Sequence, residues 1–356
     1  MNIYDLAREA GVSIATASKA INGRGDVSER TRAKVLEVAK RLHYHPSHLA
    51  RGLAQRRTEN IGVVVMRPRS APFLADPFYS RLVEGMEREL TARNYNLLLS
   101  IVPGEGAESA ERLPKLVREK NADGLVLLGE MPQDMVKEII ASRIPTVIVG
   151  FQIPKLSAHY VLTDNRGGEH SLVGHLAALG HQNIAFVRSG THDYSFAERQ
   201  AGFEDACTVH KVIGTVWNVP VGGRPLIEDE ILRRLQATER PSAVLAADDH
   251  HALAVLRVAH ALGLRVPEDL SVAGFDDNYG SELAGPGLTT LRVDWEGMGL
   301  RAAQGVFRMM ESSPELSGFE EVPVELVVRG TTGPPFFRGR GGMAYTPDLG
   351  SGAQKA

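Results

Sequence analysis

Cysteine and long apolar runs are scarce in the 356-residue sequence. The single cysteine, Cys207, excludes an intramolecular disulfide framework and favours a reducing compartment, and we expect it to be a small buried residue on a helix. No run of about 18 apolar residues is present, and the N-terminus lacks a cationic stretch followed by an apolar one. The sequence therefore predicts neither a membrane helix nor a signal peptide, and it favours a cytoplasmic location.

The spacing patterns of common catalytic sites are also missing. There is no Walker loop, no HExxH pair and no GxSxG elbow. The glycines of GEG at 104–106 follow a predicted strand but lack a third glycine, so an ordinary loop is the better interpretation. The residues of ADDHH at 247–251 cannot all converge on one ion from a helix start, and His43, His45 and His48 suit a surface or a phosphate contact better than a metal. We expect no catalytic residue, no metal and no cofactor.

Charge is unevenly spread along the chain. With 43% hydrophobic residues the chain has ample material for cores, and its length suggests two or three domains. Residues 1–57 hold 11 Lys and Arg against 5 Asp and Glu, a net charge of +6, whereas the rest of the chain has a net charge of −9. A small basic head on a large acidic body indicates that only the head meets a polyanion.

The first 44 residues have the pattern of three short helices. Residues 3–10 place apolar side chains on one face at helical spacing, and Gly11 then ends this helix. Ser13 is placed to cap a second helix, and Ser28 opens a third after the turn-rich stretch NGRGD at 22–26. Two helices joined by a tight glycine-containing turn and braced by a third have helix-turn-helix geometry.

The second predicted helix is unusually slim. We expect Ala17 and Ile21 to point inward, while its outward face carries Ile14, Ala15, Ser18, Lys19 and Asn22. A helix in the major groove, about 12 Å wide, needs small residues near the bases and hydroxyls near the phosphates. If this helix served only to pack against its neighbours, its outward face would not need this combination of small, hydroxyl and basic side chains. Together with the basic charge of the head, the sequence therefore predicts DNA binding.

Beyond the head, a linker precedes alternating strands and helices. Residues 45–59 have the composition of a linker. Within it, Pro46 and Ser47 could start a marginally stable helix from Ser47 to Ala54, which we expect to form only when a partner is bound. Strands are then expected at 61–66, 95–102, 123–129 and 145–150, with helices at 78–93, 107–121 and 132–143. This alternation predicts a parallel sheet.

After the stretch VLTDNRGG the alternation begins again. Helices are expected at 165–179, 196–208, 226–236 and 250–262, with strands at 184–190, 242–248 and 270–277. Two sheets in sequence imply two lobes and a cleft, and because a strand at 288–294, a helix at 294–312 and a strand at 322–330 come late, we expect the lobes to exchange segments. The expected domains are a helix-turn-helix head at 1–44, a hinge at 45–59, an N-subdomain at 60–161 with 293–320, a C-subdomain at 162–292 with 321–335 and a disordered tail at 336–356.

Several stretches together resemble the lactose and purine repressor family. They are IYDLAREAGVSIATASKAIN, VSERTRAKVLEVAKRLHYHPSHLARGL, DPFYSRLVEGMERELTARNYNLLL, VLTDNRGGEHSLVGHLAALGHQNIAFV, ERQAGFEDA, LRVPEDLSVAGFDD and LTTLRVD, in family order. The resemblance implies an all-α helix-turn-helix head with a hinge helix, followed by a two-lobed α/β domain like that of periplasmic binding proteins, with two parallel sheets around a cleft.

The resemblance implies which head residues contact DNA. Ile14, Ala15 and Lys19 would read bases, and the residues expected to hold the backbone or the groove are Ser13, Thr16, Ser18, Asn22 and Tyr44. Lys19 replaces a more usual arginine, and because lysine cannot form a bidentate fork on guanine, the preferred half-site would differ or be read less stringently. Ala17 replaces a commoner valine, from which we expect a looser head.

The hinge and the effector site also follow from the resemblance. In the hinge, Leu53 would insert into the minor groove at the operator centre with Ala50 beside it, and unstacking the base step costs a few kcal/mol. The residues expected to bind an effector at the strand ends are Asp76, Phe78, Arg199, Asp248 and Asp276. Alternatives are a helix cap for Asp248 and a turn residue for Asp277. The long stretch at 67–78 suggests a di- or oligosaccharide, for example an α-glucoside.

The sequence therefore predicts a homodimeric, ligand-controlled transcriptional repressor. Two-fold symmetry implies a pseudo-palindromic operator, and lobe movement would change the angle between the heads. Its partners would be double-stranded operator DNA and a small molecule, most simply a carbohydrate, which could act as inducer or corepressor. Two other classes of protein fit the sequence less well. The absent signal peptide and the basic head argue against a solute-binding protein of a transport system, and the absent catalytic constellation argues against a Rossmann-type enzyme.

Overall fold

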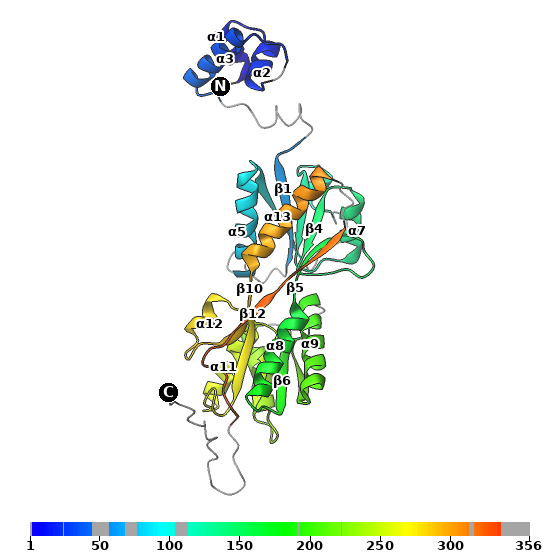
Figure 1. Ribbon diagram of the computed structural model, residues 1–356, viewed down its shortest axis with the longest axis vertical. Coiled ribbons are helices and arrows are strands. Elements are labelled where there is room, and N and C mark those ends of the chain that lie inside the picture. Colours follow the sequence, from blue (N-terminus) through cyan, green and yellow to red (C-terminus); the bar gives the residue numbers. More distant parts are fainter. Residues whose placement is uncertain are drawn as a thin grey trace, which may run out of the picture.

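The computed structural model describes residues 2–23, 25–44, 57–67, 77–103, 113–190, 193–221, 223–312 and 317–335. The described chain forms a small helical head and a body of two α/β lobes stacked end to end (Figure 1). The expected head and two-lobed body are confirmed. No helix among the described residues is both long and apolar enough to cross a membrane.

The head contains three helices, each started by a side chain that the sequence places at its N-terminus. They are α1 (Ile3–Ala10), α2 (Ile14–Ile21) and α3 (Glu29–Arg41). Ser13 and Ser28 accept hydrogen bonds from the backbone N–H of Thr16 and Thr31, as expected for N-caps. Gly11 ends α1 with φ of 64°, a left-handed conformation that favours glycine. Local capping therefore fixes the end of α1 and the starts of α2 and α3.

A small core joins these helices. Its buried residues are Leu6, Ala10, Ala20, Val35, Val38 and Ala39, and Ala17 of α2 is also fully buried. Because α2 contributes only alanines to the buried set, it lies close to its neighbours and leaves its other face free. Ile21 is half-buried and packs against the same core, as expected from its inward position.

The first lobe, here called the N-lobe, is built on a six-stranded sheet in which all strand pairs are parallel. Its order is β11 (Gly318–Val322), β5 (His159–Thr163), β4 (Thr146–Val149), β3 (Gly124–Leu128), β1 (Asn60–Arg67) and β2 (Asn96–Pro103). In the register of the central strands, Val63 lies beside Leu99 and Val126. Helices α5 (Pro77–Ala92) and α13 (Trp295–Glu311) pack against each other on one side of the sheet.

The opposite side of the N-lobe sheet is covered by α7 (Gln133–Ala141) and the single turn α6 (Lys115–Arg118). Successive residues of a strand alternate between the two covers, so that Val63 faces the core of α5 and α13 while Val64 faces that of α7. Burial on both sides is why these strands read as continuous apolar runs in the sequence.

The second lobe, the C-lobe, repeats this architecture. Its sheet has the order β12 (Val324–Val327), β10 (Thr289–Val293), β9 (Ser271–Asp276), β8 (Ala243–Ala246), β6 (Asn183–Ser189) and β7 (Ile213–Val219). Only the pair of β10 with β12 is antiparallel among the described pairings. The helices are α8 (Asn165–Ala178), α9 (Tyr194–His210), α10 (Arg224–Leu235), α11 (Asp249–Ala261) and α12 (Tyr279–Leu283).

The chain crosses between the lobes at three points. It leaves the N-lobe sheet after β5 at Asp164, returns after β10 at Asp294, and crosses again at Pro323 between β11 and β12. Asp164 and Asp294 have nearly the same backbone angles and each caps the next helix, through Gly167 N at 2.8 Å and Gly297 N at 2.9 Å. The expected exchange of segments between lobes is therefore present, and the first two crossings share one local geometry.

Some sequence expectations were wrong. The expected strand at 322–330 is shorter, and it corresponds to β12 (Val324–Val327). Val322 instead ends β11 in the other sheet, because Pro323 has no backbone N–H to continue a ladder and the chain changes lobe there. The helix expected at 107–121 is reduced to one turn, α6, within the described residues. The strand β7 was missed because it lies at a sheet edge and its first residues are exposed, and β11 and α12 were missed as well.

Cys207 is buried in α9, as expected. Several predictions lie outside the described residues: the hinge helix with Ser47, Ala50 and Leu53, the loop with Asp76, and the tail at 336–356.

Candidate functional site

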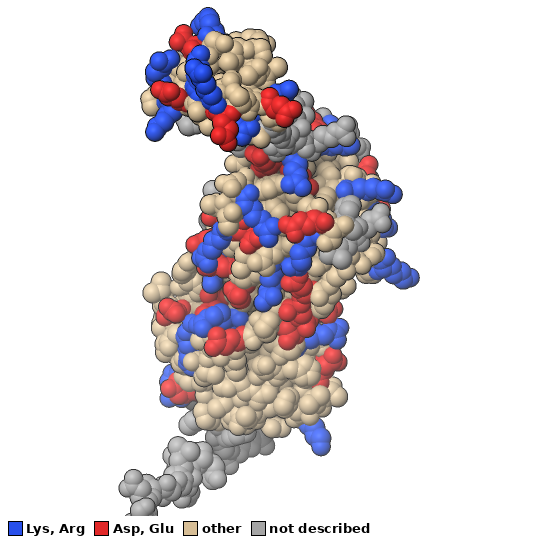
Figure 2. Space-filling model, turned by 45° about the horizontal axis from the view of Figure 1, so that its top comes forward, with Lys and Arg blue, Asp and Glu red and all other residues tan. Residues whose placement is uncertain are grey.

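The first candidate surface is the outward face of α2. Ile14 is 43% exposed, and Ala15 and Lys19 are also exposed, while Ser18 and Asn22 are half-buried at the edge of this face. Figure 2 shows Lys and Arg side chains spread over the head, with acidic side chains among them. A slim helix with small side chains and one cation toward solvent has the shape and charge to enter a major groove.

Hydroxyl groups mark the N-terminal end of α2. Ser13 Oγ and Thr16 Oγ1 lie 2.8 Å apart, and Ser13 Oγ also accepts from Thr16 N at 3.1 Å. At the other end, Asn22 donates to Ser18 Oγ at 3.4 Å. Hydroxyls and backbone N–H groups at a helix N-terminus suit a phosphate oxygen. The structure thus brings together seven of the predicted DNA contacts, Ser13, Ile14, Ala15, Thr16, Ser18, Lys19 and Asn22, on one helix and its caps.

Tyr44 and Lys19 have additional intramolecular contacts. Tyr44 is half-buried and packs against the head core, and burial raises the pKa of its phenol. The stem of Lys19 lies over Gly25, whose φ of 73° is favoured by glycine, and a Cβ added there would approach Lys19 Cδ to 3.1 Å. The turn after α2 therefore positions the one cation of the exposed face.

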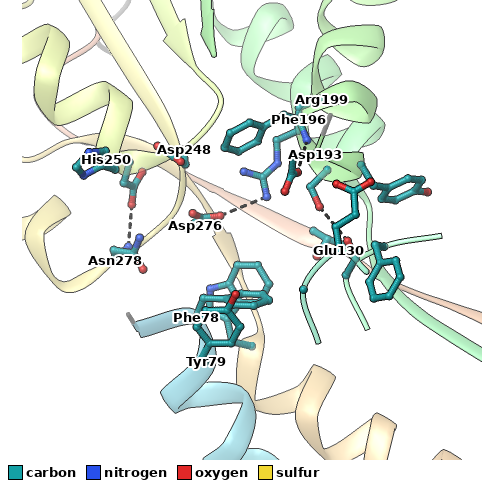
Figure 3. Close-up of a pocket in the computed structure, with 18 of the residues that line it drawn as sticks. Phe78, Tyr79, Glu130, Asp193, Phe196, Arg199, Asp248, His250, Asp276 and Asn278 are labelled. Carbon is teal, nitrogen blue, oxygen red and sulfur yellow. Dashed lines mark hydrogen bonds and ion pairs between the residues drawn. The ribbon is translucent and has the colours of Figure 1, made fainter. Parts of the chain in front are cut away.

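The second candidate site is a cleft of about 570 Å³ between the lobes. It lies at the carboxyl ends of strands in both sheets, where parallel sheets bind ligands, and its volume is that of a small-molecule site. Four of the five predicted effector residues line it: Phe78, Arg199, Asp248 and Asp276. Figure 3 shows Arg199, Asp248 and Asp276 on the C-lobe side, with Phe78 and Tyr79 on the opposite side at the start of α5.

Arg199 of α9 is buried at the base of the cleft, with 4% of its surface exposed. Its Nε donates to Asn165 Oδ1 at 2.8 Å, its Nη1 donates to the carbonyl of Ala247, and its Nη2 donates to Asp276 Oδ1 at 3.3 Å. The guanidinium also lies 3.5 Å from the centroid of the Phe275 ring. Each nitrogen of Arg199 thus donates a hydrogen bond within the protein, and the bond from Nη2 orients the Asp276 carboxylate.

Glu169 of α8 is fully buried close to Arg199. Neither of its carboxyl oxygens has a hydrogen-bond partner within the described part of the chain. Burial raises the pKa of Glu169 to about 8, although the charge of Arg199 lowers it. At neutral pH this carboxyl is therefore mostly protonated, and Asp276 is the ionised partner of Arg199.

The backbone bends sharply at the end of β9. Asp276 has φ of 110° and Asp277 has φ of 53°, both in the region that favours glycine. Asp277 does not line the cleft; it accepts from Arg292 Nε at 2.8 Å and is 2.7 Å from Arg329 Nη2. The contacts of Asp277 therefore indicate the turn role. Asp276 combines a strained backbone conformation with a carboxylate that faces the cleft, and such strain is often found at functional sites.

Asp248 and Asp249 begin α11 and have separate roles. Asp248 caps the helix through His251 N and also accepts from His251 Nδ1, both at 2.7 Å. Burial acts to raise the pKa of Asp248, but the charge and hydrogen bonds of His251 outweigh it and hold the pKa well below its usual range. Asp248 is therefore both a helix cap and an ionised acceptor in the cleft.

Asp249 is almost completely buried and accepts from Thr290 Oγ1 at 2.6 Å and from Asn278 N at 2.8 Å. Burial raises its pKa to about 6, against the effect of these hydrogen bonds. Asp249 thus fixes the loop that follows Asp276 at the end of β9.

Sequence reasoning missed most of the aromatic lining. Tyr79, Phe151, Tyr194, Phe196, Tyr279 and Trp295 also line the cleft, as do Glu130, Asp193 and Asn278. Phe78 forms T-shaped contacts with Tyr79 and Trp295, at centroid distances of 4.7 and 4.8 Å. The sequence offers one sign of these residues, namely that Glu130 and Phe151 each follow the end of a predicted strand. No spacing pattern in the sequence links the segments that meet in the cleft.

The two lobes contact each other at one side of the cleft. Ser195 at the start of α9 donates to the carbonyl of Gly150 at 3.1 Å, and the Tyr194 hydroxyl lies 3.5 Å from Gln152 Oε1. These bonds join the C-lobe to the loop after β4. A ligand between the lobes would therefore bind where a few polar contacts already join them.

Comparisons with known proteins agree with this architecture. Residues 2–47 match bacterial regulatory proteins of the lacI family, and residues 173–332 match the periplasmic binding protein-like domain. Catabolite control protein A of Priestia megaterium is 30% identical over 349 residues, covering 93% of this chain and 99% of that protein.

Two solved structures extend the comparison. The lac repressor dimer bound to operator and the anti-inducer ONPF has a TM-score of 0.80 at 26% identity, covering 94% of this chain and 99% of that one. A complex of the regulator CelR with cellobiose has a TM-score of 0.68 at 28% identity, covering 93% and 99%. The chain belongs to the lacI family of bacterial regulatory proteins, and it is a DNA-binding transcriptional regulator rather than an enzyme.

Proposed function

We propose that this regulator is a repressor that binds a pseudo-palindromic operator as a dimer and is controlled by a carbohydrate in the interlobe cleft. The observation that carries the DNA part is the outward face of α2, where Ile14, Ala15 and Lys19 are exposed on a helix whose buried residues are alanines. A two-fold dimer would place two such helices in successive major grooves.

The DNA contacts are assigned from this face. We propose that Ile14, Ala15 and Lys19 contact base edges, and that Ser13, Thr16, Ser18 and Asn22 hold the backbone. Because Lys19 offers a point charge where an arginine would offer a planar fork, the preferred half-site should be less selective for guanine at that position. Tyr44, Ala50 and Leu53 complete the proposed interface, the last two through a hinge in the minor groove.

The carbohydrate part of the proposal is supported by the composition of the cleft. Asp248 and Asp276 offer carboxylate acceptors for hydroxyl groups, and Phe78 with its aromatic neighbours offers a face for a sugar ring. The complex of CelR with cellobiose gives one glucoside as a precedent. A volume of about 570 Å³ suits a disaccharide, and we propose a glucoside, with α-linked maltose and β-linked cellobiose as the two forms to compare.

One experiment tests the DNA part. The full chain is titrated against palindromic and random duplexes at several salt concentrations, together with Lys19→Ala and the control Lys137→Ala, which removes an exposed lysine of α7. We expect tight, steeply salt-dependent binding to a palindromic site that weakens only in Lys19→Ala. Equal binding of all sequences, or no effect of Lys19→Ala, would contradict the proposed reading helix.

A second experiment tests the effector. Maltose, cellobiose and their parent glucose are added to the full chain in a thermal shift assay, where a ligand at 100 times its Kd stabilises by about 2.7 kcal/mol. The same sugars are then added to the protein–operator complex. Release of DNA identifies an inducer and tighter binding a corepressor, while a lack of any shift by any sugar would contradict a carbohydrate effector.

A further inference from the structure

Among the charged side chains in the described lining of the cleft, most are carboxylates. Five acidic residues line it, and the single guanidinium among these lining residues is that of Arg199. The acidic residues are Glu130, Asp193, Asp248, Asp249 and Asp276. They come from both lobes, and Figure 3 labels Glu130 of the N-lobe and Asp193 of the C-lobe among the residues that line the cleft. An anion entering this cleft would meet like charges on both sides.

Arg199 does not provide a binding site for an anion. A carboxylate or phosphate group is held best by two free N–H groups of one guanidinium, but three of the five N–H groups of Arg199 already donate to Asn165, Ala247 and Asp276. The residue is 4% exposed. An anionic ligand that reached the buried guanidinium would therefore meet the Asp276 carboxylate, which is already paired with it.

The two helix N-termini at the cleft are already capped by carboxylates of the protein. A helix N-terminus normally attracts an anion through its free N–H groups and its dipole. At α9, Asp193 Oδ1 accepts from Phe196 N at 3.0 Å, and at α11, Asp248 Oδ1 accepts from His251 N at 2.7 Å. Each terminus thus already holds a carboxylate from its own chain, which occupies the place where a phosphate or carboxylate would bind.

We propose that the cleft selects its effector by charge, accepting an uncharged or cationic polyhydroxy compound and rejecting sugar phosphates, sugar acids and nucleotides, with Asp193 and Asp248 imposing the selection. This inference rests on the proposed carbohydrate effector and narrows its chemical class. Hydroxyl groups donate hydrogen bonds to carboxylates, so the side chains that repel anions can bind a neutral sugar. The aromatic side chains beside Phe78 favour the apolar face of the same compound.

The test uses matched pairs on the full chain. Maltose is compared with maltose 6′-phosphate, cellobiose with cellobiose 6′-phosphate, and glucose with glucuronate, by thermal shift and calorimetry. Because like charges facing each other across an interface cost several kcal/mol, we expect the neutral member of each binding pair to bind about 100-fold more tightly. An anionic member that binds as tightly as its neutral partner would overturn the inference.

Variants separate charge from the size of the added group. Asp193→Asn and Asp248→Asn keep a side chain that can cap a helix but remove the negative charge. We expect each variant to reduce the ratio of neutral to anionic affinity about tenfold. The exposed Asp229→Asn in α10 is a control that should leave this ratio unchanged. If the ratio of neutral to anionic affinity is unchanged in both cleft variants, size alone excludes the anions, and the proposed role of charge is overturned.

Failure of the proposed function gives a different result. If no sugar of either charge binds but a nucleoside monophosphate stabilises the protein, then both the carbohydrate effector and the selection by charge are wrong. If a sugar phosphate binds better than its parent sugar, the carbohydrate effector stands and only the charge selection fails.

Discussion

Arg199 donates a hydrogen bond to Asp276 across 3.3 Å, and the carboxylate that accepts it belongs to a residue with φ of 110°. The pair joins α9 to the end of β9 at the base of the cleft, with the ring of Phe275 beneath the guanidinium. A non-glycine residue rarely adopts such a backbone conformation unless its surroundings hold it there. The ion pair therefore helps to fix the orientation of the Asp276 carboxylate toward the ligand space.

Removing Arg199 should affect both stability and ligand response. Arg199→Ala leaves the half-buried Asp276 carboxylate without this ion-pair partner and the buried Asn165 and Ala247 acceptors without their donor. We therefore expect a loss of about 3–5 kcal/mol in unfolding free energy and loss of any thermal shift by an effector. The control Arg224→Ala removes an arginine that is 62% exposed and should cost less than about 1 kcal/mol. Denaturant unfolding measures the first effect. A variant that is as stable as the control and still shifted by the effector would contradict the assigned role.

The buried carboxyl of Glu169 should make stability depend on pH. Its pKa is raised from 4.5 to about 8 by burial, so the native state keeps the proton that the unfolded state loses. The protonated carboxyl therefore adds to the free energy of unfolding, relative to an ionised one. This stabilisation is fully present below pH 4.5 and is lost as the pH rises to about 8. Glu169→Gln should therefore gain stability relative to the wild type as the pH rises from 5 to 8, as measured by urea midpoints. Exposed Glu325→Gln is the control, and parallel curves for Glu169→Gln and the wild type would refute the prediction.

The lobe crossing at Asp294 should not tolerate a side chain at Gly297. A Cβ added at Gly297 would overlap the Asp294 carboxylate that caps α13, so Gly297→Ala should lose the cap, which is worth about 0.5–2 kcal/mol, together with the cost of the overlap. Gly174→Ala in α8 is the matched control, because its nearest neighbour at 3.3 Å is the end of the exposed His210 side chain. Thermal unfolding of the two variants gives the comparison. Equal stability would mean that the crossing adapts to the added side chain.

The cap of α2 should act on both folding and DNA binding. Ser13→Ala removes the acceptor for Thr16 N and should cost about 0.5–2 kcal/mol, and Ser28→Ala should cost a similar amount at α3. If the Ser13 hydroxyl also holds a phosphate, only Ser13→Ala should weaken operator binding beyond its effect on head stability. Fluorescence anisotropy with a labelled operator, below the unfolding range of both variants, separates the two effects. Equal affinity of both variants would remove Ser13 from the interface.

Local sequence determined the elements of this protein. The caps at Ser13 and Ser28, the glycine after α1 and the inward alanine of α2 all depend on residues within a few positions of one another, so a helix-turn-helix head could be predicted from them. The two-lobed body could be predicted because strands buried on both faces leave continuous apolar runs. Edge strand β7 was missed for the same reason, since half of its pattern faces solvent.

Only the tertiary structure decided which side chains meet in the cleft. Glu130, Asp193, Asp248 and Trp295 come from four distant segments, and the order of strands in two sheets brings them together. The partners of Arg199 were likewise set by packing, since its three nitrogens are used by groups 34 to 77 positions away. Sequence patterns record local periodicity and capping, whereas the charge balance of a cleft depends on contacts between segments that the chain itself does not place side by side.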